Sequence, residues 1–247
     1  MPRSSLSRVL RSLWVALGIS LTIWIVWGYQ SLDLPSGVLL TNSAVKVTDT
    51  DDRITFQPRA NRRTTGVIFL PGGMVDPAAY APLLKNLSAA GHPAHLVRLP
   101  MRSAFLESQI TEVFQSVTAI LKANPDTRWY LAGHSRGAML ASRFARESQS
   151  NIAGLILIGT THPRDFDLSA SPLQVTKIMG THDGVATPEA TRANAALLPK
   201  STTWVEIPGA NHVQFGYYRH QLLDGEPGIT RAEQQAALLK AVRRAFQ

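Results

Sequence analysis

Residues 129–137, which read WYLAGHSRG, decide the fold expected for this sequence. Trp129–Ala132 is an apolar run typical of a buried strand, and small residues from Gly137 onward favour a helix. The intervening Gly133-His134-Ser135-Arg136-Gly137 fits the pattern G-x-S-x-G, in which a serine occupies a sharp strand-to-helix turn. The flanking glycines let neighbouring backbone pass close to the turn, where any larger side chain would collide with it. The spacing predicts that Ser135 is an exposed nucleophile and that the Arg136 N–H is one oxyanion donor.

Outward from this turn, strands alternate with helices. The predicted strands are Gly66–Leu70, His95–Leu99, Trp129–Ala132, Gly154–Ile158, Val175–Met179 and Thr203–Ile207. The predicted helices are 76–90, opened by the N-cap Asp76, then 106–121 with Leu106 on its apolar stripe, 137–147, 188–198 capped by Thr187, and 230–246 opened by a Thr230/Glu233 capping box. This alternation predicts an α/β fold with a mostly parallel sheet flanked by helices. A leading antiparallel hairpin from Ala44–Val47 and Arg53–Phe56 completes one domain over residues 35–247.

Two further polar residues follow predicted strands. Asp183 comes after Val175–Met179, and His212 comes after Thr203–Ile207. A serine hydroxyl needs a base to remove its proton and a carboxylate to orient that base. Because parallel strands end at one edge, the order Ser135, Asp183, His212 predicts a catalytic triad there. Asp165 and Asp167, in the loop after Ile158, are the rival acids.

The second oxyanion donor is expected in the loop after Gly66–Leu70. This loop, Pro71-Gly72-Gly73-Met74, can turn an N–H of Gly73 or Met74 toward the serine. It lacks the glycine spacing and the lysine of a phosphate-binding loop. No His/Asp/Glu group has metal-ligand spacing, so we expect neither metal nor cofactor.

The amino-terminal segment is set apart by its composition. Between Arg11 and Asp33 there is no charge, and the span 13–29 is long enough to cross a bilayer. The basic tail 1–12, with Arg3, Arg8 and Arg11, predicts a cytoplasmic amino terminus and an extracytoplasmic domain. The alternative is a signal peptide, but the apolar part is long and no A-x-A-like cleavage site follows it. We therefore expect a single-pass membrane protein.

The overall composition excludes several classes. With 45% hydrophobic and 17% charged residues the chain is neither disordered nor collagen-like, and it has no cysteine for disulfides or a thiol nucleophile. Its net charge of +8 comes from scattered residues rather than a basic stripe, so we expect no nucleic-acid partner.

The segments LPGGMVDPAAYAPL, GHSRG, GTHDG and GANHVQFGYY together resemble small bacterial serine hydrolases of the α/β-hydrolase superfamily, of the dienelactone-hydrolase-like or esterase type. The similarity covers about Thr65 to Phe246. It implies Ser135 as nucleophile, Asp183 as acid, His212 as base, and Gly73 or Met74 with Arg136 as oxyanion donors. Arg136 departs from the commonest elbow, in which an apolar residue follows the serine, and a true dienelactone hydrolase would carry cysteine at position 135.

The resemblance, taken together with the apolar amino-terminal span, predicts a membrane-anchored hydrolase of a small-molecule ester or acyl substrate. Acyl transfer by the same triad and a non-catalytic binding module are the alternatives. The segment 159–172 is too short for a sizeable lid. Met74, Met139 and Tyr217 or Tyr218 are candidates to line an apolar acyl site.

Overall fold

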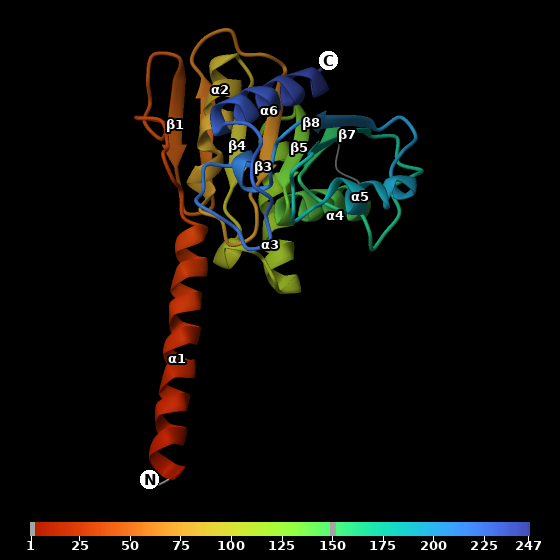
Figure 1. Ribbon diagram of the computed structural model, residues 1–247. Coiled ribbons are helices and arrows are strands. Elements are labelled where there is room, and N and C mark those ends of the chain that lie inside the picture. The colour runs from red at the N-terminus through yellow and green to blue at the C-terminus, as the bar shows by residue number, and fades with distance from the viewer. Residues whose placement is uncertain (1–2, 149–151) are drawn as a thin grey trace.

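The computed structural model describes residues 3–148 and 152–247 and centres on one sheet (Figure 1). Within those residues its strands are β1 (Val45–Asp49), β2 (Arg53–Pro58), β3 (Thr65–Leu70), β4 (Ala94–Val97), β5 (Arg128–His134), β6 (Gly154–Ile158), β7 (Gln174–Gly180) and β8 (Thr203–Ile207). Their order across the sheet is β1-β2-β4-β3-β5-β6-β7-β8. The strands from β4 to β8 are parallel, and the β1–β2 hairpin joins β4 antiparallel. The predicted mostly parallel sheet and its leading hairpin are therefore confirmed.

Helices cover both faces of the sheet. One core cluster joins it to α2 (Ala81–Ala89) and α6 (Arg231–Ala245), and a second joins it to α3 (Glu107–Ala123) and α4 (Arg136–Glu147). Shorter helices lie in the loops: η1 (Pro77–Tyr80), η2 (Pro100–Arg102), α5 (Pro188–Arg192), η3 (Ala195–Leu197) and η4 (Val213–Phe215). The segment between β6 and β7 contains no helix or strand, so the expected absence of a sizeable lid is confirmed.

Capping residues fix where these helices begin. Asp76 Oδ1 accepts the Ala78 N–H at 3.1 Å ahead of η1, and Thr187 caps α5. At α6 the Thr230 side chain accepts the Glu233 N–H while the Glu233 carboxylate accepts the Thr230 N–H. These observed caps confirm the predicted helix starts. Each cap accepts an N–H group of the first helical turn that has no partner within the helix.

Three local predictions are wrong. The helix expected over 188–198 ends at Arg192 and gives way to η3, because the Asn194 side chain donates to the Thr161 carbonyl in a neighbouring loop at 3.0 Å. The strand expected to reach Leu99 ends at Val97, two residues before Pro100, which has no N–H for a strand pairing and begins η2. Leu106 lies just before α3 and is exposed instead of belonging to its buried stripe.

The helix α1 (Arg3–Gly28) extends as a rod away from the edge of the domain at which α3 also protrudes (Figure 1). Residues 1–2 of the predicted tail lie outside the described residues. Within α1, Ser7–Gly28 is long and apolar enough to cross a membrane, with a mean hydropathy of 1.9 over an 18-residue window of which no residue is buried. A signal sequence would have the same character.

Candidate active site

Ser135 occupies a strained turn between β5 and α4. Its φ of 51° and ψ of −114° lie in a region that L-residues rarely adopt. A Cβ at Gly137 would stand 1.9 Å from the Leu70 carbonyl oxygen, and one at Gly133 would stand 2.4 Å from the Gly137 carbonyl carbon. Both glycines are therefore required by close backbone approaches, which hold the turn in its strained form.

Asp183 and His212 form a buried pair at the same edge of the sheet. Asp183 follows β7 and His212 follows β8, and His212 Nδ1 lies 2.9 Å from Asp183 Oδ2 with both side chains inaccessible to solvent. The second carboxylate oxygen accepts the N–H groups of Val185 and Ala186 at 2.9 and 2.6 Å. These backbone bonds fix the carboxylate, and the carboxylate in turn fixes the plane of the imidazole.

His212 Nε2 is buried and has no hydrogen-bond partner among the described residues. Ser135 and His212 line one cavity of about 280 Å³. No hydrogen bond joins Ser135 Oγ to His212 in the described part of the chain, and such bonds often tighten only when substrate is bound. The structure therefore brings the three predicted triad residues to one place and leaves His212 Nε2 without a hydrogen-bond partner among the described residues.

Asp224 organises the loops of this pair and was not predicted from the sequence. Its carboxylate accepts the His212 and Val213 N–H groups at 3.0 and 2.8 Å, and the Gly184 N–H at 3.2 Å. One side chain thus joins the loop after β8 to the loop after β7. Its partners are backbone amides, which leave no motif in the sequence.

The two predicted oxyanion-loop residues differ in what their amides do. The Met74 N–H donates to the Arg102 carbonyl at 2.7 Å and to Ser103 Oγ at 3.1 Å. The Gly73 N–H has no acceptor within the described residues, and a Cβ at Gly73 would lie 3.2 Å from the Arg136 Cβ. Gly73 and Arg136 are therefore adjacent beside Ser135, and Gly73 is the better placed donor of the two.

The Arg136 side chain is bonded to the loop before α3 at the border of the cavity. It donates to the carbonyls of Ser103 and Ala104 at 3.1 and 2.6 Å, and it lies over the Phe105 ring. Burial lowers the pKa of the guanidinium, which remains charged at neutral pH. The unusual arginine of the elbow thus holds the loop before α3 against the nucleophile turn.

A neutral aromatic layer supports the site from below. His134 is fully buried, its ring centroid lies 4.4 Å from that of His212, and its Nδ1 is hydrogen-bonded to Tyr80 Oη at 2.8 Å. Burial, and then the neighbouring His212, lower the pKa of His134 well below its usual range. The Gly72 N–H donates to the same Tyr80 oxygen, which ties this layer to the oxyanion loop.

The cavity takes its remaining walls from three loops. It is lined by Ser135, Arg136, Met139, Gly159, Thr160, Thr161, His162, Arg164, Val185, Ala186 and His212. Of the residues expected to line an acyl site, Met139 lines this cavity. Met74 is exposed and lies outside it, and Tyr218 is buried against Tyr29. Asp165 and Asp167, the rival acids, are exposed and make no contact with His212 in the described chain.

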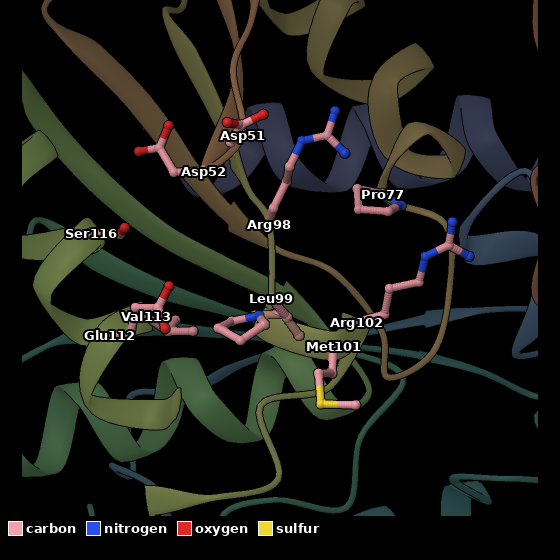
Figure 2. Close-up of a pocket in the computed structure, with 11 residues that line it drawn as sticks. Asp51, Asp52, Pro77, Arg98, Leu99, Met101, Arg102, Glu112, Val113 and Ser116 are labelled. Atoms are coloured by element: carbon pink, nitrogen blue, oxygen red, sulfur yellow. The ribbon is translucent and has the colours of Figure 1, made fainter. Parts of the chain in front are cut away.

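A second cavity of about 440 Å³ lies beside β4, between the β1–β2 turn and α3. Figure 2 shows Asp51 and Asp52 on one side of it and Arg98 and Arg102 nearer Pro77. This cavity is larger than the one beside Ser135, but none of Ser135, Asp183 and His212 lines it, and we therefore do not assign the reaction to it.

Residues 66–236 match the family model described as the Alpha/beta hydrolase family. The chain belongs to the alpha/beta hydrolase family. This alpha/beta hydrolase matches no curated protein at a significant level. The predicted superfamily and fold class are confirmed.

Solved structures share the fold at low identity. A serine hydrolase without a lid from Xanthomonas campestris is 18% identical with a TM-score of 0.58, over 83% of this chain and 96% of that one. An alpha-beta serine hydrolase homologue from Coxiella burnetii is 15% identical with a TM-score of 0.58, over 83% and 98%. A monoacylglycerol lipase from Paleococcus ferrophilus is 16% identical with a TM-score of 0.58, over 81% and 99%. At sequence identities of 15–18%, the similarity to these structures establishes a shared fold and nothing about substrate.

Proposed function

We propose that this alpha/beta hydrolase is a membrane-anchored serine hydrolase that cleaves a carboxylic ester through an acyl-enzyme. The observation that carries the proposal is the buried bond from His212 Nδ1 to Asp183, with Nε2 left free beside Ser135 in one cavity. A histidine held in this way is oriented to accept a proton from the serine. The strained turn at Ser135 supports the same assignment.

In the first half of the reaction, Ser135 Oγ attacks the acyl carbon and its proton passes to His212 Nε2. The oxyanion that forms is stabilised by the N–H groups of Gly73 and Arg136, and removing one such donor typically costs about 3–4 kcal/mol. The bond from the acyl carbon to the alcohol oxygen then breaks, and His212 gives its proton to the departing alcohol.

In the second half, His212 takes a proton from water as the water oxygen attacks the acyl carbon. The bond to Ser135 Oγ breaks, the proton returns to that oxygen, and the carboxylic acid leaves. The balance is one ester and one water converted to one acid and one alcohol. Asp183 keeps its charge throughout and stabilises the imidazolium.

Membrane attachment is the second part of the proposal. The apolar span in α1, and arginines before it with Asp33 after it, support a cytoplasmic amino terminus and an extracytoplasmic catalytic domain. Protease added to spheroplasts should digest the domain without lysis. Digestion only after lysis would reverse the topology, and recovery of the domain in a soluble fraction without α1 would replace the anchor by a signal peptide.

The catalytic proposal is tested with a fluorophosphonate probe and short p-nitrophenyl esters. The full chain in detergent should be labelled and active, while Ser135→Ala should lose both properties and melt within a few degrees of the natural protein. Ser201→Ala, at an exposed position outside the cavity, is the matched control and should keep both. Undiminished ester turnover by Ser135→Ala would refute the mechanism.

A further inference from the structure

Large exposed apolar side chains gather at the carboxyl edge of the sheet. Outside α1, eight such residues are exposed in the described chain, and all but Leu40 lie in loops that follow β3, β4, β7 or β8. We name these seven the apolar rim: Met74, Met101, Phe105, Leu106, Val185, Leu222 and Leu223. Single exposed apolar residues are ordinary, but a set confined to one edge indicates a surface that contacts something apolar.

The loops that carry the apolar rim are joined to one another around Ser135. The Met74 N–H is bonded to the Arg102 carbonyl, next to Met101. The Arg136 guanidinium holds the Ala104 carbonyl, next to Phe105. On the other side of the cavity Gly184 packs against the Leu223 backbone, since a Cβ there would lie 2.3 Å from its carbonyl oxygen. Loops that carry members of the apolar rim therefore meet on both sides of the Ser135 cavity.

Backbone strain accompanies the exposure. Met74, Met101 and Leu223 have φ angles of 64°, 48° and 70°, in the left-handed region that non-glycine residues seldom occupy. Strained backbone persists where surrounding structure holds it, and it concentrates at functional positions. These three apolar side chains are therefore exposed to solvent, and their backbone is in a conformation that is unfavourable for residues other than glycine.

The end of α1 is docked among the same loops. The Gly28 carbonyl accepts the N–H groups of Arg219 and His220 at 3.0 and 3.2 Å, and the Trp24 ring lies 4.0 Å from that of His220. Arg102 donates to the Gln30 side chain at 3.2 Å. Tryptophans at the end of a spanning helix lie at headgroup level. If α1 crosses a bilayer, residues bonded to Gly28 lie at its surface, and Leu222 follows them by only two positions.

The reaction cavity is small for a lipid. At about 280 Å³ it lies just under the 300–1,000 Å³ usual for ligand pockets, and its walls include threonines, histidines and arginines. It can hold the reacting ester group, but the remainder of a long acyl chain must lie outside it. The apolar rim is the surface next to which that remainder would lie.

We propose that the apolar rim rests in the bilayer that α1 spans and that Ser135 cleaves lipid esters whose acyl chains remain in that bilayer. This rests on the proposed hydrolase function and on α1 remaining attached. Docking of Gly28 fixes the domain with its catalytic edge toward the membrane, so the substrate reaches Ser135 from the lipid phase. The apolar rim contacts the bilayer leaflet at which α1 ends.

The first test measures contact without catalysis. Because the chain has no cysteine, Leu222→Cys can be labelled at one site with an environment-sensitive fluorophore, with the equally labelled Leu40→Cys as matched control. Full chains are placed in phosphatidylcholine vesicles with and without brominated acyl chains. We expect about two-fold quenching or more at position 222 and none at position 40, because only the former is buried at the acyl boundary. Equal quenching at the two positions would overturn the proposal.

The second test measures turnover in the same vesicles. Met101→Ser with Leu222→Ser should lower hydrolysis of a long-chain diacylglycerol about ten-fold, because α1 still holds the chain in the vesicle but two apolar contacts that keep the catalytic edge against the bilayer are lost. Hydrolysis of soluble p-nitrophenyl acetate should be unchanged, and Leu40→Ser should leave both rates unchanged. Natural-rate cleavage of diacylglycerol by the double variant, or cleavage of the soluble ester alone by the natural protein, would overturn the lipid assignment. Inactivity on both esters would instead refute the hydrolase function, while the quenching result would still decide where the apolar rim lies.

Discussion

A buried lysine in β7 should make the stability of this protein rise with pH. Lys177 is 1% exposed, and its ammonium donates to the His162 carbonyl. Burial disfavours the charged form and lowers the pKa of Lys177 to about 7. In the unfolded chain the same group would titrate near its ordinary value of 10.5.

The sign follows from proton counting. Between pH 7 and 10.5 the unfolded chain keeps the lysine proton while the native chain has largely lost it, so raising the pH favours the native state. Below pH 7 both states are protonated and the cost of burying the charge is fully present. Integrating the difference from pH 7 to pH 9 gives a gain of about 2 kcal/mol in the free energy of unfolding.

The assay is urea unfolding of the full chain in detergent at pH 7, 8 and 9, for the natural protein and for Lys177→Met. Methionine keeps an unbranched side chain of similar length and removes the titration, so every other ionisable group cancels in the difference. We expect the natural protein to gain about 2 kcal/mol relative to Lys177→Met over this interval. A difference that stays constant with pH, or that moves in favour of methionine, would refute the reasoning.

Three further variants probe the scaffold of the site. Asp224→Asn removes the charge from the acceptor that joins the loops of Asp183 and His212. A hydrogen bond to a charged group is worth about 2 kcal/mol, so losing that energy from the transition state should lower kcat roughly thirty-fold at unchanged KM; an unaltered kcat would contradict this. Gly137→Ala drives a Cβ into the Leu70 carbonyl and should cost more than about 3 kcal/mol in urea unfolding, whereas Gly18→Ala, with open space around it, should cost nothing. Tyr80→Phe leaves a buried amide of the oxyanion loop unpaired and should lower stability by about 1–3 kcal/mol, so an unchanged unfolding midpoint would count against that bond.

The fold was predictable because its signals are local. Apolar runs of five residues give the central strands, and the predicted caps at Asp76, Thr187 and Thr230 are made in the structure. The break after Arg192 was not predictable, because the bond that ends the helix comes from a loop thirty-odd residues earlier in the chain, at Thr161.

The part of the candidate site that could be predicted is the part in which the reaction requires a particular residue type. Residues that only accept hydrogen bonds from backbone amides could not be predicted, because several residue types can do so. Ser135, Asp183 and His212 could be proposed because a nucleophile, a base and an acid must each follow a strand. Asp224 and Tyr80 act on backbone amides and carry no such pattern. The apolar rim was missed for another reason: Leu106 has the spacing of a buried stripe, and only the structure shows that it faces outward.

Asp76 connects the position of α1 to the geometry of the oxyanion loop. Its Oδ1 caps η1, its Oδ2 accepts the Ser31 hydroxyl at 2.9 Å, and its N–H donates to the Tyr29 carbonyl at 2.9 Å. The residue stands three positions after Gly73, within a loop whose other amides are bonded to Tyr80 and Arg102. Displacing this loop would require several of these hydrogen bonds to break together, at a net cost of about 1 kcal/mol each. The end of α1 and the proposed oxyanion donor are therefore linked by a continuous set of hydrogen bonds, which under the proposed membrane attachment would hold the reaction centre at a fixed distance from the bilayer.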